Sequence, residues 1–171
     1  PRNGRLLPDQ TRAIADLSAR MGNGLMDLTS RANLQLRGLD DKGHEQALAT
    51  LAALDLLDLT PQAEARRNII LSPFATPDSS PWQLAEILAT ALTANDAPEI
   101  PTKFGFAIDT PTPVLQTAPA DIRLIPQPTG WLIQPEGGDW ALPAQNAPEA
   151  ASHALSLTRW FLKDGAPNGR G

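Results

Sequence analysis

The stretch 22–38 constrains the fold more than any other part of the sequence, because two short alternating segments flank a turn there. Met26 and Leu28 alternate with polar residues in the first segment, and Leu34 and Leu36 do so in the second. Period-two alternation on both sides of a turn predicts an antiparallel hairpin with one aliphatic face. That face needs a covering layer, so we expect helices to pack against it.

The opposite face of the predicted hairpin is polar, and two interpretations of it remain open. It is either the solvated outer face of an antiparallel sheet or a surface that holds a polar, carboxylate-rich ligand. The density of hydrogen-bonding groups motivates the second interpretation. The side chains on this face are Asp27, Thr29, Asn33, Gln35 and Arg37, with Arg31 at the tip of the turn.

Amphipathic helices are predicted on both sides of the hairpin, at about 8–21 and 41–57. Pro8 suits a first helical position, and the pair Asp40-Asp41 suits the cap of the second helix. Helix, hairpin and helix form the middle of a split βαβ unit, in which both helices cover one sheet face. The first strand of such a unit would precede Pro1.

The rest of the chain predicts a second α+β unit at 66–164, after a connector near 58–65. Seventeen prolines indicate short elements joined by stiff loops. Residues 165–171 are predicted to form a flexible tail. The expected strands lie at 69–73, 103–109, 121–125, 131–134 and 140–142, and the expected helices at 80–94 and 146–164.

Composition excludes several classes of function. A net charge of −5 argues against a general binder of nucleic acid or of anionic membranes, because both need a basic surface. The chain has no cysteine, so it cannot ligate an iron–sulfur cluster through thiolates or form a disulfide. No apolar run approaches the roughly 20 residues that cross a bilayer, and the chain is expected to be soluble and cytoplasmic.

Signatures of catalysis are scarce. There is no nucleophile elbow, no phosphate-binding loop and no zinc-protease motif. His44 and His153 lie on different predicted helices without a partner at ligand spacing, which favours surface histidines over a metal site. The remaining candidates are cations. Arg66-Arg67 precede a strand, and they form either an anion site or a solvated basic pair.

Three segments resemble the sirohaem-dependent nitrite and sulfite reductase family. They are Leu-Thr-Ser-Arg-Ala-Asn-Leu-Gln-Leu-Arg-Gly at 28–38, Arg-Asn-Ile through Ser-Pro at 67–73, and Ile-Pro-Thr-Lys-Phe-Gly at 100–105. The matches follow the family's order with similar spacing and reach from about residue 6 to residue 109. Within the family, the first and third segments are most similar to those of the precorrin-3B synthases of aerobic cobalamin biosynthesis.

The resemblance implies a ferredoxin-like half-domain at 1–58, with an antiparallel sheet, helices on one face and its first strand missing. It also implies that 66–164 is part of a tetrapyrrole-binding α/β domain of the sulfite-reductase type. The acetate and propionate arms of a tetrapyrrole would meet charge-assisted donors. The tetrapyrrole-binding residues implied in this way are Arg31, Gln35, Arg37, Arg67, Asn68 and Lys103.

One departure from the family pattern bears on the ligand. The reductases carry a second lysine two residues after the first, where this chain has Gly105. The loss of that cation favours the precorrin enzyme, whose substrate is the macrocycle itself. Glycine at this position permits close approach of a ligand, or it marks a simple bulge; both interpretations remain open.

The resulting hypothesis is the N-terminal half of a precorrin-3B-synthase-like oxygenase that binds precorrin-3A. A 4Fe-4S cluster would come from a missing C-terminal half or another chain, and the 171-residue chain is expected not to turn over alone. Two alternatives remain. One is half of a sirohaem-dependent nitrite or sulfite reductase, and the other is a cofactor-free binding or assembly module.

Overall fold

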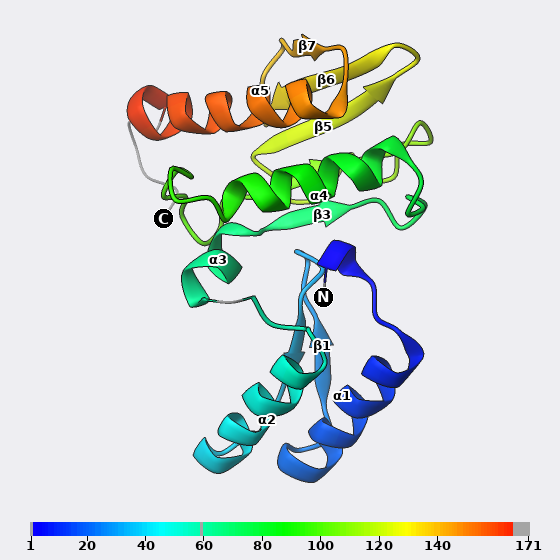
Figure 1. The fold of residues 1–171 in the computed structure, drawn as a ribbon, viewed down its shortest axis with the longest axis vertical. Coiled ribbons are helices and arrows are strands. Elements are labelled where there is room, and N and C mark those ends of the chain that lie inside the picture. Colours follow the sequence, from blue (N-terminus) through cyan, green and yellow to red (C-terminus); the bar gives the residue numbers. More distant parts are fainter. Residues whose placement is uncertain (1, 59, 166–171) are drawn as a thin grey trace. The chain divides into compact units, whose positions relative to one another are not determined.

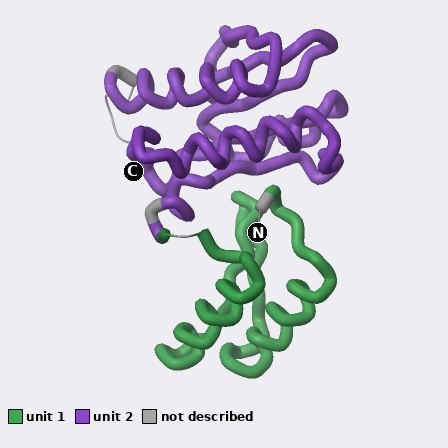
Figure 2. The backbone as a smooth tube through the Cα atoms, viewed as in Figure 1, with its two compact units in different colours: residues 1–60 green, residues 61–171 purple. Residues whose placement is uncertain are grey.

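The structure is a computed structural model that describes residues 2–58 and 60–165. The chain divides into two compact units, residues 1–60 and residues 61–171 (Figure 2). Both units mix helices with strands, so the prediction of an α+β fold is confirmed. No helix in the described ranges is long and apolar enough to cross a bilayer.

Unit 1 consists of a two-stranded antiparallel sheet and two helices that pack on each other. The helix starts agree with the sequence signals. The Leu7 N–H donates to Gln10 Oε1 at 2.8 Å just before the first helix, and Asp40 Oδ1 accepts the Gly43 N–H at 2.7 Å at the start of the second. The elements are η1 (Arg2–Gly4), α1 (Pro8–Met21), β1 (Met26–Leu28), β2 (Leu34–Leu36) and α2 (Asp41–Ala53).

Two expectations for unit 1 need correction. Helix α2 ends at Ala53 and not near residue 57, because Asp55 has a φ of 55°, a left-handed conformation that a helix cannot continue through. The aliphatic face of the hairpin is also less covered than predicted. Leu28 is 81% exposed, because the turn end of the hairpin extends past the ends of both helices (Figure 1).

Unit 2 is a five-stranded sheet with the order β3-β4-β5-β6-β7. Strands β3, β4 and β5 are parallel, and β5, β6 and β7 continue as an antiparallel meander. The elements are α3 (Pro61–Arg66), β3 (Ile69–Leu71), α4 (Ser80–Leu92), β4 (Phe106–Ile108), β5 (Ile122–Gln127), β6 (Gly130–Pro135), β7 (Leu142–Ala144), α5 (Ala147–Trp160) and the π-turn η2 (Phe161–Gly165).

The core of unit 2 lies between the sheet and the helices α4 and α5, which pack side by side on one sheet face (Figure 1). Alternation along each strand supplies the sheet side of this core. Each buried aliphatic or aromatic side chain contributes about 1.5–3 kcal/mol. The fully buried members include Leu84, Leu88, Leu92, Phe106, Ile108, Leu124 and Ile133.

The loop between β4 and β5 is held by two charged side chains. The buried carboxylate of Asp109 accepts the backbone N–H groups of Val114 and Leu115 through Oδ2, at 3.0 and 2.9 Å. Arg123 donates from Nη1 to the Leu115 carbonyl at 2.6 Å and from Nη2 to the Ala118 carbonyl at 2.7 Å. The loop therefore has a fixed course even though it contains no regular element.

Several boundaries in unit 2 differ from the predictions. The expected strand 103–109 is shorter, since only 106–108 pairs in the sheet and a turn precedes it, closed by the Phe104 N–H on the Pro101 carbonyl. Helix α3 lies in the predicted connector. Helix α4 begins at Ser80, as predicted, with Ser79 in the N-cap position, and ends at Leu92, two residues before the predicted end. Of the predicted tail 165–171, all but Gly165 lies outside the described residues.

Candidate functional site

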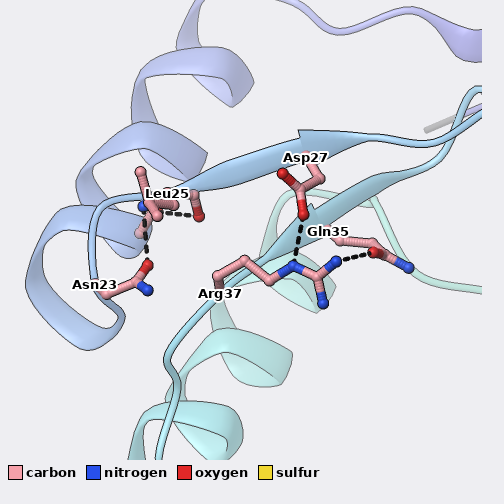
Figure 3. A network of polar contacts seen from close by, with 6 residues as sticks. Asn23, Leu25, Asp27, Gln35 and Arg37 are labelled. Atoms are coloured by element: carbon pink, nitrogen blue, oxygen red, sulfur yellow. Dashed lines mark hydrogen bonds and ion pairs between the residues drawn. The ribbon is translucent and has the colours of Figure 1, made fainter.

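The polar face of the hairpin carries a network of three side chains (Figure 3). Arg37 Nε donates to Asp27 Oδ2 at 2.7 Å, and Arg37 Nη2 donates to Gln35 Oε1 at 2.8 Å. Asp27 and Gln35 are direct cross-strand partners, so the pairing register itself places both acceptors beside the guanidinium. Two predicted site residues, Gln35 and Arg37, are thus brought together.

This network faces water. The side chain of Arg37 is 52% exposed and that of Asp27 is 55% exposed. An ion pair at that exposure contributes little to stability, about 0.2–1 kcal/mol. Its physical effect is therefore mainly to fix the direction of the guanidinium, which would otherwise sample many rotamers.

The turn that carries Arg31 is organised by Thr29. The Thr29 hydroxyl accepts the backbone N–H groups of Arg31 and Asn33, at 3.3 and 3.1 Å. The Thr29 N–H in turn donates to the Asn33 carbonyl at 2.9 Å, and the turn is closed through Ala32, which has a φ of 57°. Arg31 is half-buried at this tip. The threonine of the segment 28–38 therefore acts on backbone geometry.

The base of the hairpin is fixed to α1 by a close backbone approach. Gly22 follows the helix, and a Cβ built on it would lie 2.3 Å from the Arg37 carbonyl oxygen. The Ser18 hydroxyl, which is buried, donates to the Leu25 carbonyl at 3.2 Å, and the Asn23 N–H donates to the Arg37 carbonyl at 3.0 Å. The backbone of Arg37 is thus held from two sides.

The predicted site residues of unit 2 lie at one edge of its sheet. Arg67 and Asn68 directly precede β3, and Lys103 lies in the turn that precedes β4. Because β3 and β4 are parallel, these residues share the amino-terminal edge. Asn68 bridges the two strands, since its Nδ2 donates to the Phe104 carbonyl at 3.1 Å and its own carbonyl accepts the Phe106 N–H at 2.9 Å.

Gly105 is explained by a neighbour in its own chain. A Cβ at this position would lie 3.0 Å from Asn68 Nδ2, so the close approach that the sequence suggested is made by an amide of unit 2. The Gly105 N–H also donates to Asp121 Oδ2 at 2.8 Å. These contacts argue against a ligand lying directly on the Gly105 backbone, and they favour a structural interpretation of the glycine.

The two clusters of candidate residues belong to different units. Arg31, Gln35 and Arg37 lie in unit 1, and Arg67, Asn68 and Lys103 lie in unit 2. In unit 1, Arg37 donates to Gln35, and in unit 2, Asn68 donates to the Phe104 carbonyl next to Lys103. The expectation that both clusters grip one ligand stays a prediction.

Among the remaining candidates, Arg66 Nη2 lies 3.9 Å from Glu99 Oε1, a loose ion pair. His44 is exposed on α2, and His153 is half-buried on α5. Within the described ranges, no group of three or more His, Cys, Asp or Glu residues could hold a metal ion.

Two acidic residues at these clusters were missed at the level of sequence. Asp27 was placed on the polar face but given no part in a site, although its period-two relation to a cross-strand arginine and glutamine was a usable signal. Asp121 holds the backbone beside Lys103 through Gly105, and no local pattern pointed to it, because the two segments are joined only by the sheet.

Comparisons with known proteins agree with the geometry of unit 1. Residues 1–54 match the family described as the nitrite/sulfite reductase ferredoxin-like half domain. The beta subunit of the NADPH sulfite reductase of Saccharomyces cerevisiae is 30% identical over 84 residues, which cover 49% of this chain and 6% of that subunit. The chain therefore spans a small part of this relative. No solved structure matches the chain.

Proposed function

We propose, from the premise that residues 1–54 belong to the nitrite/sulfite reductase ferredoxin-like half-domain family, that this chain binds a tetrapyrrole through the carboxylate arms of the macrocycle. The observation that carries the proposal is the ordered Arg37 guanidinium on the polar face of the hairpin. A fixed guanidinium is suited to a carboxylate, because its donors match the two oxygens in one plane.

The macrocycle arms supply the complementary charge. Acetate and propionate groups radiate from a tetrapyrrole ring, and each would take a charge-assisted hydrogen bond worth roughly 1.5–3 kcal/mol. We propose Arg31 and Arg37 of unit 1 as donors to these arms; Arg67 and Lys103 of unit 2, which the family resemblance also implies, are a separate set of candidates. Local cations of this kind are compatible with the overall net charge of −5, because recognition depends on the few groups near each arm.

The residues of this chain do not fit an iron–sulfur cluster. Such clusters are held by cysteine thiolates, and the sequence contains no cysteine. We therefore assign this chain the binding and orientation of the macrocycle, while any cluster would be held by a further segment or another chain. No redox step is assigned to the residues of this chain.

We propose precorrin-3A as the ligand, which would make the chain part of a precorrin-3B-synthase-like oxygenase. The support is Gly105, at the place where the reductases carry a second lysine. A Cβ there would lie 3.0 Å from Asn68 Nδ2, so a lysine would require that amide to shift, and this chain lacks the extra cation that would grip a small anion such as sulfite. A substrate that is itself the macrocycle needs no such grip.

A sirohaem-dependent nitrite or sulfite reductase is the second candidate, and the similarity to the yeast sulfite reductase subunit supports it. In that case the tetrapyrrole would be a resident cofactor and not a substrate. The carboxylate contacts proposed for this chain would be the same, since sirohaem also carries acetate and propionate arms.

A titration of the purified chain tests the binding proposal. The probes are uroporphyrin, whose pyrroles all carry acetate and propionate arms, and mesoporphyrin, which carries few carboxylates. We expect a saturable shift of the porphyrin absorbance band with uroporphyrin and much weaker binding of mesoporphyrin. Equal affinity for both probes would point to stacking on apolar surface, and absence of binding would favour the cofactor-free module.

The nature of the ligand is tested on the full-length gene product. Sirohaem absorbance bands together with iron would support the reductase. Iron and sulfide without haem bands would support the oxygenase. A colourless, iron-free product would contradict both.

A further inference from the structure

We propose that Asp27 is a positioning residue, which holds the Arg37 guanidinium so that its outer edge receives one carboxylate arm of the ligand. The inference rests on the proposed function and deepens it, because it gives a part to an acidic residue in a site that binds acids. At first sight such a residue should repel the ligand.

The first observation behind the proposal is the number of N–H donors that Arg37 leaves unused within the chain. A guanidinium has five N–H bonds in one plane and no acceptor. Arg37 uses two of them inside the chain, from Nε to Asp27 and from Nη2 to Gln35. The three others, two on Nη1 and one on Nη2, donate to no other residue in the ranges that the structure describes.

The placement of those donors carries the second step. Figure 3 shows the bond from Nε to Asp27 and the bond from Nη2 to Gln35 on different sides of the guanidinium, and the remaining edge, at Nη1, carries no bond to either residue. Half of the Arg37 side chain is exposed to solvent, so an incoming carboxylate can reach this edge. The two N–H groups on Nη1 can donate charge-assisted hydrogen bonds to a carboxylate.

The register of the hairpin carries the third step. Asp27 lies opposite Gln35, and Arg37 lies two residues after Gln35, just past the end of β2 and on the same face. The backbone of Arg37 is also fixed, by the Asn23 N–H on its carbonyl and by its own N–H on the Leu25 carbonyl at 3.1 Å. With backbone and inner edge both held, the outer edge has one preferred direction.

The charge of Asp27 gives the proposal a distinctive test. Removal of the whole side chain abolishes the acceptor for Nε, whereas Asp27→Asn removes the charge and keeps an oxygen that can accept. If Asp27 positions Arg37, Asp27→Ala binds uroporphyrin about 3- to 5-fold more weakly. Asp27→Asn should restore the affinity of the unmodified chain or exceed it, because a repulsive charge is gone.

Arg37 variants complete the test. Arg37→Lys keeps the charge and loses the planar fork, so it should bind uroporphyrin nearly as weakly as Arg37→Ala, about 10-fold below the unmodified chain. Asp9→Ala is the matched control. Asp9 is also an exposed aspartate, paired with Arg12 at 2.8 Å on α1, and its removal should leave uroporphyrin affinity unchanged.

Three results would overturn the proposal. One is that Asp27→Ala and Asp27→Asn tighten binding equally, which would make the residue a mere repulsive charge. Another is that both weaken binding equally, with a loss of far-ultraviolet circular dichroism, which would make it a folding residue. The third is that Arg37→Lys binds as well as the unmodified chain.

Failure of this inference can be told apart from failure of the proposed function. If the unmodified chain binds uroporphyrin and Arg31→Ala weakens that binding, while the Asp27 and Arg37 variants do not, only the positioning inference fails. If the unmodified chain does not bind uroporphyrin, the proposed function fails first.

Discussion

The two units of this chain bury their apolar side chains to different degrees. Unit 2 contains all four phenylalanines and all four tryptophans, and it encloses a continuous core between its sheet and two helices. Unit 1 contains no phenylalanine, tryptophan or tyrosine, and among its described residues the buried apolar side chains are Ile14, Leu17 and Ala47. Surface groups thus dominate unit 1, whereas core packing dominates unit 2.

The difference shows that polar side chains have different parts in the two units. In unit 2, polar residues such as Asn68, Asp109 and Arg123 are used to hold loops and strand ends. In unit 1, Asp27, Gln35 and Arg37 hold one another on an exposed face. Tryptophan fluorescence reports on unit 2 alone, whereas far-ultraviolet circular dichroism reports on both units. The two signals together can therefore show which unit a substitution destabilises.

The largest effect is expected from Phe106→Ala. Phe106 is fully buried in β4 and contacts Phe104 edge-on at 5.5 Å between ring centroids. The cavity should lower the free energy of unfolding of unit 2 by about 3–5 kcal/mol. Urea unfolding followed by tryptophan fluorescence measures it, and a midpoint equal to that of the unmodified chain would contradict this account of the core.

A smaller loss is expected from Asp109→Ala. The substitution leaves the N–H groups of Val114 and Leu115 without their acceptor and should cost about 2–3 kcal/mol. The same fluorescence-detected unfolding measures this cost. Amide hydrogen exchange at Leu115 should also accelerate; protection unchanged there would mean that the loop is held by Arg123 alone.

A still smaller loss, of about 1 kcal/mol in the free energy of unfolding of unit 1, is expected from Asp40→Ala, which removes the cap of α2. The transition seen by circular dichroism should shift to lower urea, with no change in the fluorescence transition. Asn146→Ala removes the corresponding cap of α5 in unit 2 and is the matched variant. It should move both transitions, and if Asp40→Ala did so too, the two units would not unfold independently.

The smallest effect is expected from Leu28→Ser. Because this side chain is 81% exposed, the substitution should change the free energy of unfolding of unit 1 by less than about 0.5 kcal/mol. Thermal unfolding followed by circular dichroism checks it. A loss of several degrees in the transition temperature would show that Leu28 is buried in solution.

Local signals in the sequence predicted much of this fold. Pro8 and Asp40 mark helix starts because capping chemistry is local, and the alternation around Met26 and Leu34 gave the hairpin. Helix α3 was not predicted because its six residues include too few apolar positions to show a helical period, although residues 63–66 favour helix. The start of the strand near Phe104 was misplaced because the Phe104 side chain is buried by packing outside the sheet, and not by strand pairing.

The candidate site was predicted only in part, because the sequence shows local periodicity but not which strands become neighbours. Gln35 and Arg37 share a face by period two, which the sequence displays, so their association was foreseeable. The contact of Asn68 with the Phe104 carbonyl and that of Asp121 with Gly105 depend on parallel pairing between distant segments. No spacing within the sequence encodes which strands become neighbours.

The central proposal is that the arginines of the unit 1 hairpin bind the carboxylate arms of a tetrapyrrole. Calorimetric titration of uroporphyrin into the unmodified chain, Arg31→Ala, Arg37→Ala and the double variant tests it most directly. The account predicts one ligand per chain and a loss of about 10-fold in affinity for each single variant. Affinity that is unchanged in both single variants would contradict it.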